Sequence, residues 1–228
     1  MAGVPATVFL PANAPESKAE KARAWGAEVV RAGEVWDDAD RAARDFAAAR
    51  GLAYIHPFDD PAVIAGQGTL GLEILEQAPA VDVLVVAIGG GGLISGIALA
   101  AKAAKPGIRV IGVEPTGAPT LYESVKAGRV IVLPEVTTAA NTLAPRTTAE
   151  INLAIVRRHV DAIVLVTDDE MRAAARWLWR ELGVAAELSA AAAVAAVATG
   201  KVEIATGETV CPLVCGAGTD GIDSPGRG

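Results

Sequence analysis

Residues that build disulfide frameworks and metal clusters are scarce in this sequence. It contains only two cysteines and two histidines among its 228 residues. Cys211 and Cys215 are too few for a disulfide framework, and their spacing within one apolar stretch does not suit a pair of zinc ligands. We therefore expect a protein of the reducing cytoplasm with no zinc cluster.

Positive charge is also in short supply. Lysine and arginine number 20 against 27 aspartates and glutamates, which gives a net charge of -7 at pH 7. Nucleic-acid binding proteins need an excess of positive charge, so a nucleic-acid partner is excluded. No apolar stretch reaches the roughly 20 residues that a membrane-spanning helix needs, so we also expect no membrane partner.

Short apolar, β-branched runs instead alternate with alanine-rich stretches of helical periodicity. The runs predict strands at residues 7–10, 27–31, 52–55, 81–88, 108–113, 162–166 and 210–215. Such alternation is typical of an α/β protein with a mainly parallel sheet flanked by helices. Ligands of these folds bind beyond the carboxyl ends of the strands, so the loops at those ends are the first place to look for function.

Four consecutive glycines form one of these loops. Gly89, Gly90, Gly91 and Gly92 follow the apolar run 81–88, and a helix is expected to begin near Leu93. Glycine allows left-handed backbone and a close approach of N–H groups to a ligand, and a helix N-terminus favours an anion. The pattern predicts a phosphate site, in which a side chain at position 91 would occupy the phosphate position. The alternative is a flexible turn, which needs only one or two glycines.

Five stretches, taken together, resemble a known family. They are VPATVFLPANAPESKAEKARAWGAEVV, HPFDDPAVIAGQGTLGLEIL, IGGGGLISGIA, RVIGVEP and VCGAGTD, in this order. The sequence resembles the fold type II pyridoxal-phosphate enzymes, and within them the threonine/serine dehydratase and serine racemase group. The resemblance implies a tryptophan synthase β-like architecture. Residues 1–55 would be a remnant of the smaller domain, and residues 56–228 would form the larger, cofactor-binding domain.

The same resemblance implies a cofactor and a reaction. The cofactor would be pyridoxal 5'-phosphate, and the reaction would be β-elimination of small hydroxy amino acids to 2-oxo acids and ammonia. The loop from Gly89 to Leu93 would hold the cofactor phosphate. Cys215 would face the pyridine nitrogen, the alternative being a buried core thiol. Glu187 would head the helix beneath the cofactor, the alternative being a carboxylate that only complements a helix dipole.

Two regions depart from the family pattern. Glu114 and the carbonyl of Ala118 match positions that bind a divalent cation in the family, but Thr120 replaces the acidic third ligand. This departure argues against a structural cation. Asn141 and Thr142 replace an aspartate and a glycine, and we expect the threonine to crowd the cofactor ring.

The catalytic lysine is unknown. In the family, the lysine that binds the cofactor aldehyde covalently and the loop that grips the substrate carboxylate would both precede Met1. No lysine of this chain lies in a similar motif, so we expect impaired lyase activity. The alternatives are a phosphate- or cofactor-binding module and a repurposed hydrolase-like protein. Loss of strands would leave apolar sheet edges bare, from which we expect a homo-oligomer.

Overall fold

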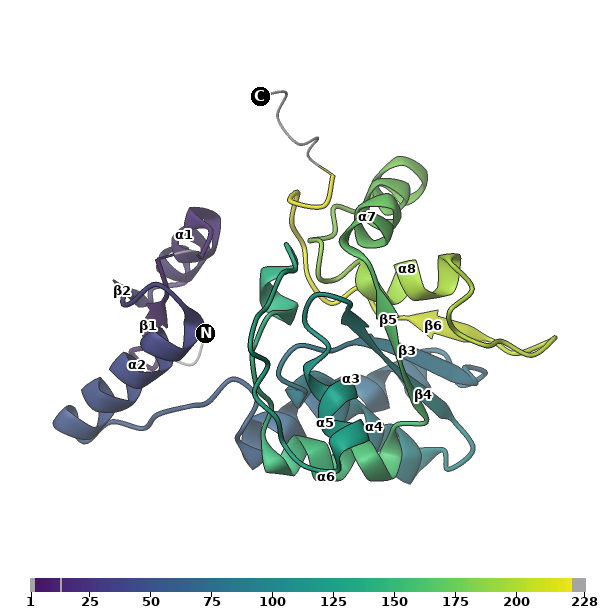
Figure 1. Cartoon of the computed structure of the whole chain (residues 1–228), viewed down its shortest axis with the longest axis horizontal. Helices are drawn as coiled ribbons and strands as arrows, with labels where there is room; N and C mark the ends of the chain where they lie inside the picture. The colour runs from purple at the N-terminus through teal and green to yellow at the C-terminus, as the bar shows by residue number, and fades with distance from the viewer. Residues whose placement is uncertain (1–2, 13, 223–228) are drawn as a thin grey trace. The chain divides into compact units, whose positions relative to one another are not determined.

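The computed structural model describes residues 3–12 and 14–222. The chain divides into two compact units, Met1–Ile55 and His56–Gly228 (Figure 1). In the first unit, β1 (Thr7–Leu10) and β2 (Glu28–Arg31) pair in parallel. Helix α1 (Glu16–Ala24) connects them, and α2 (Trp36–Arg50) packs on β1.

An edge-to-face contact anchors α2 to the small sheet. The rings of Phe9 and Phe46 lie 5.3 Å apart at an interplanar angle of 61°. Residues 52–55, predicted as a strand, are extended without strand pairing in the described structure, so this prediction is wrong. A run of suitable residues becomes a strand only where a neighbouring strand completes its hydrogen bonds.

The second unit contains a four-stranded parallel sheet in the order β5-β4-β3-β6. Its strands are β3 (Val83–Ala87), β4 (Arg109–Pro115), β5 (Ala162–Val166) and β6 (Val210–Pro212). Strand β6 ends earlier than predicted. Its ladder with β3 closes with a hydrogen bond from the Leu213 amide to the Val85 carbonyl.

Helices cover both faces of this sheet (Figure 1). One face packs against α3 (Pro61–Gln77), α4 (Gly92–Ala104), α5 (Thr120–Ala127) and α6 (Glu150–His159). The other face packs against α7 (Asp168–Leu182) and α8 (Ala192–Ala198). A single 3₁₀ turn, η1 (Asn141–Leu143), precedes α6. Among the described residues, no helix is long and apolar enough to cross a membrane.

Strand β3 shows why the sequence gives this layered arrangement. Its side chains alternate between the two cores: Val83 and Val85 join the α7–α8 core, whereas Leu84 and Val86 join the α4–α6 core. A strand covered on both faces has no polar side, so its sequence is a continuous apolar run. The expected α/β fold with a mainly parallel sheet is therefore confirmed.

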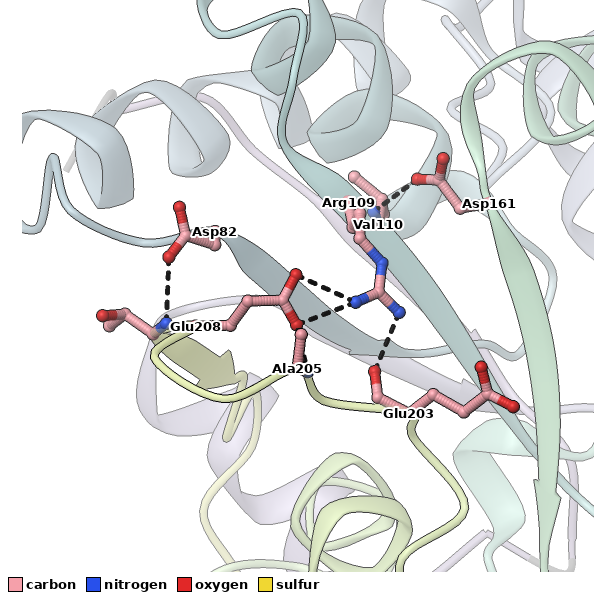
Figure 2. A network of polar contacts seen from close by, with 8 residues as sticks. Asp82, Arg109, Val110, Asp161, Glu203, Ala205 and Glu208 are labelled. Carbon is pink, nitrogen blue, oxygen red and sulfur yellow. Dashed lines mark hydrogen bonds and ion pairs between the residues drawn. The ribbon is translucent and has the colours of Figure 1, made fainter.

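Charged residues close the amino edge of the sheet. Arg109 at the start of β4 pairs with Glu208 at 3.0 Å and donates to the Glu203 carbonyl, and Asp161 accepts from the Val110 amide at 2.7 Å (Figure 2). Asp82 likewise accepts from the Thr209 amide. The loops at this edge are tied together, which leaves the opposite, carboxyl edge for a ligand site.

Helices α3 and α4 approach one another so closely that their backbones touch. A Cβ atom at Gly96 of α4 would collide with the Ile64 carbonyl oxygen of α3 and would lie 2.7 Å from the Gly68 amide nitrogen. Gly66, on the exposed side of α3, would meet nothing within 4 Å. This contact positions α4, whose first turn follows the four glycines.

We expect Gly96→Ala to lower the free energy of unfolding by at least about 2 kcal/mol, because the new methyl group must displace backbone atoms. The matched substitution Gly66→Ala should raise it by about 1 kcal/mol, since alanine is the better helix former. Urea unfolding followed by circular dichroism measures both. Equal stability of the two variants would contradict the close helix contact.

Candidate functional site

The glycine loop lies at the carboxyl end of β3, the central buried strand. The Ile88 amide continues the ladder by donating to the Val113 carbonyl at 2.8 Å, and the chain then turns into α4. Gly91 stands at the N-cap of α4 with a φ of 100°, and no side chain caps the helix. Such a left-handed φ favours glycine, so the tight strand-to-helix turn is a direct product of the sequence.

The amides of this loop have no protein acceptors. Within the part of the chain that the structure describes, no acceptor takes a hydrogen bond from the amides of Gly89 to Leu93. The first bond inside α4 runs from the Ser95 amide to the Gly91 carbonyl at 3.0 Å. Unpaired amides at the positive end of a 13-residue helix are chemically suited to an anion.

The glycines are needed for contact with the protein behind the loop. A Cβ atom at Gly90 would collide with the Phe58 ring, and one at Gly89 would lie 2.5 Å from the Thr142 carbonyl oxygen. At Gly91 it would lie 2.7 Å from Leu121 Cδ1. The expectation that a side chain at position 91 points to the phosphate position was therefore wrong, because its Cβ would face Leu121 instead.

Thr148, just before α6, and Asn152, in the first turn of α6, hold the same glycine loop through hydrogen bonds. The hydroxyl of Thr148 donates to the Gly90 carbonyl at 2.8 Å, and Asn152 Nδ2 donates to the same oxygen at 3.1 Å. Asn152 Nδ2 also donates to the Phe58 carbonyl at 2.8 Å. Sequence reasoning missed both residues. The available signal was a four-residue spacing that places polar residues 148 and 152 in line with the buried Val156.

Cys215 lies in the loop that follows β6, beside the end of β3. Its residue is exposed, so the alternative of a buried core thiol does not hold. Partial burial of the thiol raises its pKa, and the nearby Glu187 carboxylate raises the pKa further. The thiol is therefore protonated and neutral at pH 7.

Glu187 connects the Cys215 loop to the glycine loop. Its amide donates to the Gly216 carbonyl at 3.1 Å, and its Oε1 accepts from the Thr142 hydroxyl at 3.3 Å. Thr142 in turn lies against Gly89 through its carbonyl oxygen. Glu187 directly precedes a helical turn that runs into α8, and its carbonyl accepts from the Ala190 and Ala191 amides at 3.0 and 3.1 Å. Its role beneath the cofactor stays a prediction. The structure thus brings together the predicted residues of three separate stretches.

Glu114 holds the start of α5 through its carboxyl group. Its side chain is fully buried and accepts from the amides of Leu121 and Tyr122 at 2.8 and 2.7 Å, in the first turn of α5. Burial raises its pKa to about 8, while the amide hydrogen bonds oppose this shift. The carbonyl of Ala118 accepts from the Thr120 amide, and the Thr120 hydroxyl donates to Pro145.

These three positions do not fit a divalent cation. The carboxylate and the carbonyl that would bind it are engaged by the start of α5, and the third position offers a hydroxyl that is itself a donor. Among the described residues, no group of three or more His, Cys, Asp or Glu side chains is placed to hold a metal ion. No step of the chemistry is therefore assigned to a metal at Glu114.

The lysines of the second unit are engaged elsewhere. Lys102 pairs with Asp161 at 2.8 Å and Lys105 with Asp82 at 3.5 Å, both at the amino edge of the sheet. The other two pairs join Lys126 to Glu123 and Lys201 to Glu170. Helix α4 alone separates Lys102 from the glycine loop by about ten residues, or roughly 15 Å. All four ammonium groups are thus held in ion pairs with carboxylates.

The fold is that of an α/β protein in which amides without protein acceptors lie at the carboxyl end of a parallel strand. The unpaired amides fit a phosphate, and a neutral thiol and a carboxylate lie beside them. A cofactor that has both a phosphate and a polar ring therefore fits the residues present.

Comparison with known proteins identifies the family. Residues 1–216 match the pyridoxal-phosphate dependent enzyme family, so the chain belongs to it. It is 41% identical over 211 residues to an L-threonine ammonia-lyase of Geobacter sulfurreducens, covering 92% of this chain and 52% of that protein. It is 39% identical over 219 residues to a phenylserine dehydratase of Ralstonia pickettii, covering 96% and 67%.

Solved structures agree with this assignment. Maize serine racemase superposes with a TM-score of 0.88 at 34% identity, covering 94% of this chain and 66% of that one. The architecture is that of the fold type II enzymes, and pyridoxal phosphate is the cofactor of the family, as predicted. The chain spans about half of the length of the threonine ammonia-lyase that it matches, 52%.

Proposed function

We propose that this chain binds pyridoxal 5'-phosphate at the carboxyl edge of its four-stranded sheet. We further propose that it is the cofactor-binding part of an enzyme for β-elimination from small hydroxy amino acids. The unpaired amides of the glycine loop are the main support for cofactor binding. The names of its relatives, a threonine ammonia-lyase and a phenylserine dehydratase, support the reaction class.

The glycine loop would hold the phosphate. The amides of Gly89 to Leu93 would donate to its oxygens, and the positive end of α4 would favour its negative charge. The phosphate would be bound by backbone groups alone, so a side chain that shifts the loop would weaken phosphate binding. The bound cofactor would supply an electron sink that eases loss of the β-hydroxyl group.

Cys215 and Glu187 would bind the cofactor beside the loop. The raised pKa of the Cys215 thiol keeps a proton on its sulfur, so a neutral group would face the pyridine nitrogen. A neutral partner leaves that nitrogen unprotonated, which suits β-elimination better than reactions that need a stronger electron sink. The Thr142 hydroxyl orients the Glu187 carboxylate at the mouth of the same edge.

The position of the lysines favours a second candidate function. Each of the four lysines in the second unit is ion-paired, and Lys102 and Lys105 lie at the amino edge of the sheet, opposite the loop. Without a lysine at the site, cofactor binding would be noncovalent, and the chain alone would act as a cofactor-binding module.

A homo-oligomeric state and a cytoplasmic location also remain predictions.

We expect Gly91→Val to abolish binding of pyridoxal 5'-phosphate, because valine disfavours a φ of 100° and its Cβ would collide with Leu121. Gly107→Ala is the control, since its Cβ would meet nothing within 4 Å. Absorbance titration measures binding by both variants. Unchanged binding by Gly91→Val, with the variant folded, would contradict the proposed phosphate site.

We expect the isolated chain to show no ordinary deaminase activity towards serine or threonine. Coupled assays for pyruvate and 2-oxobutyrate would measure it, and ordinary enzymes turn over about 1–1,000 times per second. A rate in this range would refute the binding-module alternative. Lys102→Ala and Lys105→Ala would then show whether either residue had taken the catalytic role.

A further inference from the structure

We propose that Asn152 and Thr148 are positioning residues that set the direction of the Gly90–Gly91 peptide and thereby the affinity for phosphate. The inference rests on the proposed phosphate site and adds two side chains that would not touch the ligand. Both side chains donate to one atom, the Gly90 carbonyl oxygen, at 2.8 Å from Thr148 and 3.1 Å from Asn152.

Because a peptide bond is planar, fixing the Gly90 carbonyl oxygen also fixes the direction of the Gly91 N–H, which would donate to the ligand. In a trans peptide the carbonyl oxygen of one residue and the N–H of the next point in opposite directions. The described chain has no cis peptide bond. With the Gly90 oxygen held against α6, the Gly91 N–H must point away from α6. Glycines would otherwise let this peptide rotate at little cost, because they have no Cβ to restrict it.

The same two hydrogen bonds strengthen the amide as a donor. A carbonyl that accepts hydrogen bonds polarises its peptide group, and hydrogen bonds in such chains reinforce one another. Two neutral donors on the Gly90 oxygen would therefore make the Gly91 N–H a better donor to a phosphate oxygen. They achieve this without placing a charge near the anion.

Burying the polar side chains of Asn152 and Thr148 lowers the stability of the fold unless their polar atoms find hydrogen-bond partners. Asn152 is fully buried, Thr148 is 6% exposed, and Asn152 Oδ1 has no hydrogen-bond partner among the described residues. A buried polar atom without a partner destabilises a fold, because it loses its hydrogen bonds to water. The identity of the amide nitrogen is fixed, because both of its contacts are carbonyl oxygens that only a donor can satisfy.

Asn152 also fixes the position of the loop. The second hydrogen bond of Asn152 Nδ2 goes to the Phe58 carbonyl at 2.8 Å. The Phe58 ring lies against Gly90, where a Cβ atom would collide with it. The turn that bears Phe58 is itself held by His56, whose Nδ1 accepts from the Phe58 and Asp59 amides at 3.2 and 2.7 Å. One side chain thus joins the backbone of the glycine loop to the wall behind it.

The test compares two probes that differ only in the phosphate. Pyridoxine 5'-phosphate and pyridoxine have the same ring and no aldehyde, so neither reacts with lysines. Isothermal titration of the full chain gives the dissociation constant of each probe. The constant of pyridoxine divided by that of pyridoxine 5'-phosphate is the ratio that isolates the contribution of the phosphate to binding. A residue with a purely structural role would change both constants together or change neither.

We expect Thr148→Val to weaken binding of pyridoxine 5'-phosphate about fivefold and to leave binding of pyridoxine unchanged. Thr148→Ser should retain the wild-type ratio, because it keeps the hydroxyl. Thr199→Val is the matched control, since the Thr199 hydroxyl also donates to a backbone carbonyl, that of Ala195 at 2.7 Å, at the end of α8. Asn152→Asp should reduce the ratio further, because it replaces the donor with a negative charge.

Amide NMR gives a second readout that does not depend on the ring. Inorganic phosphate should shift the Gly91 amide proton strongly in the wild type and less in Thr148→Val. If Asn152→Asp fails to fold, the Thr148 series still decides. An unchanged ratio and an unchanged Gly91 shift in folded Thr148→Val would overturn the positioning role. Equal affinity of the wild type for both probes would instead refute the phosphate site itself, and the positioning role with it.

Discussion

The close contact between the glycine loop and the protein behind it is the constraint on which the site depends. Gly90 lies against the Phe58 ring and Gly89 against the Thr142 carbonyl, at positions where no Cβ would fit. In this packed loop the amides at the start of α4 have no protein acceptor among the described residues. The proposed anion site therefore depends on packing as much as on the helix dipole.

The rest of the second unit serves this contact. Helices on both faces bury β3 completely and fix where its carboxyl end lies. The glycine contact between α3 and α4 sets the direction of the helix that presents the amides. At the amino edge of the sheet, Arg109 and its partners hold the loops together (Figure 2). These contacts stabilise the sheet at the edge opposite the proposed binding site.

Much of this could be predicted from the sequence, and the failures have physical reasons. The buried strand and the glycine loop are encoded locally, by an apolar run and four residues without side chains. The contacts of Asn152 with Gly90 and Phe58 join residues 62 and 94 positions apart, which no local pattern reveals. The role of Glu114 was missed for a similar reason, since ligand spacing alone does not show that helix amides engage the carboxylate.

A crystal structure of the full chain grown with pyridoxal 5'-phosphate would test the central claim most directly. The account predicts phosphate oxygens about 3 Å from the amide nitrogens of Gly89 to Leu93, with the Gly90 carbonyl still held by Thr148 and Asn152. A phosphate bound at another edge of the sheet, or loop amides that instead donate to protein carbonyls, would contradict it.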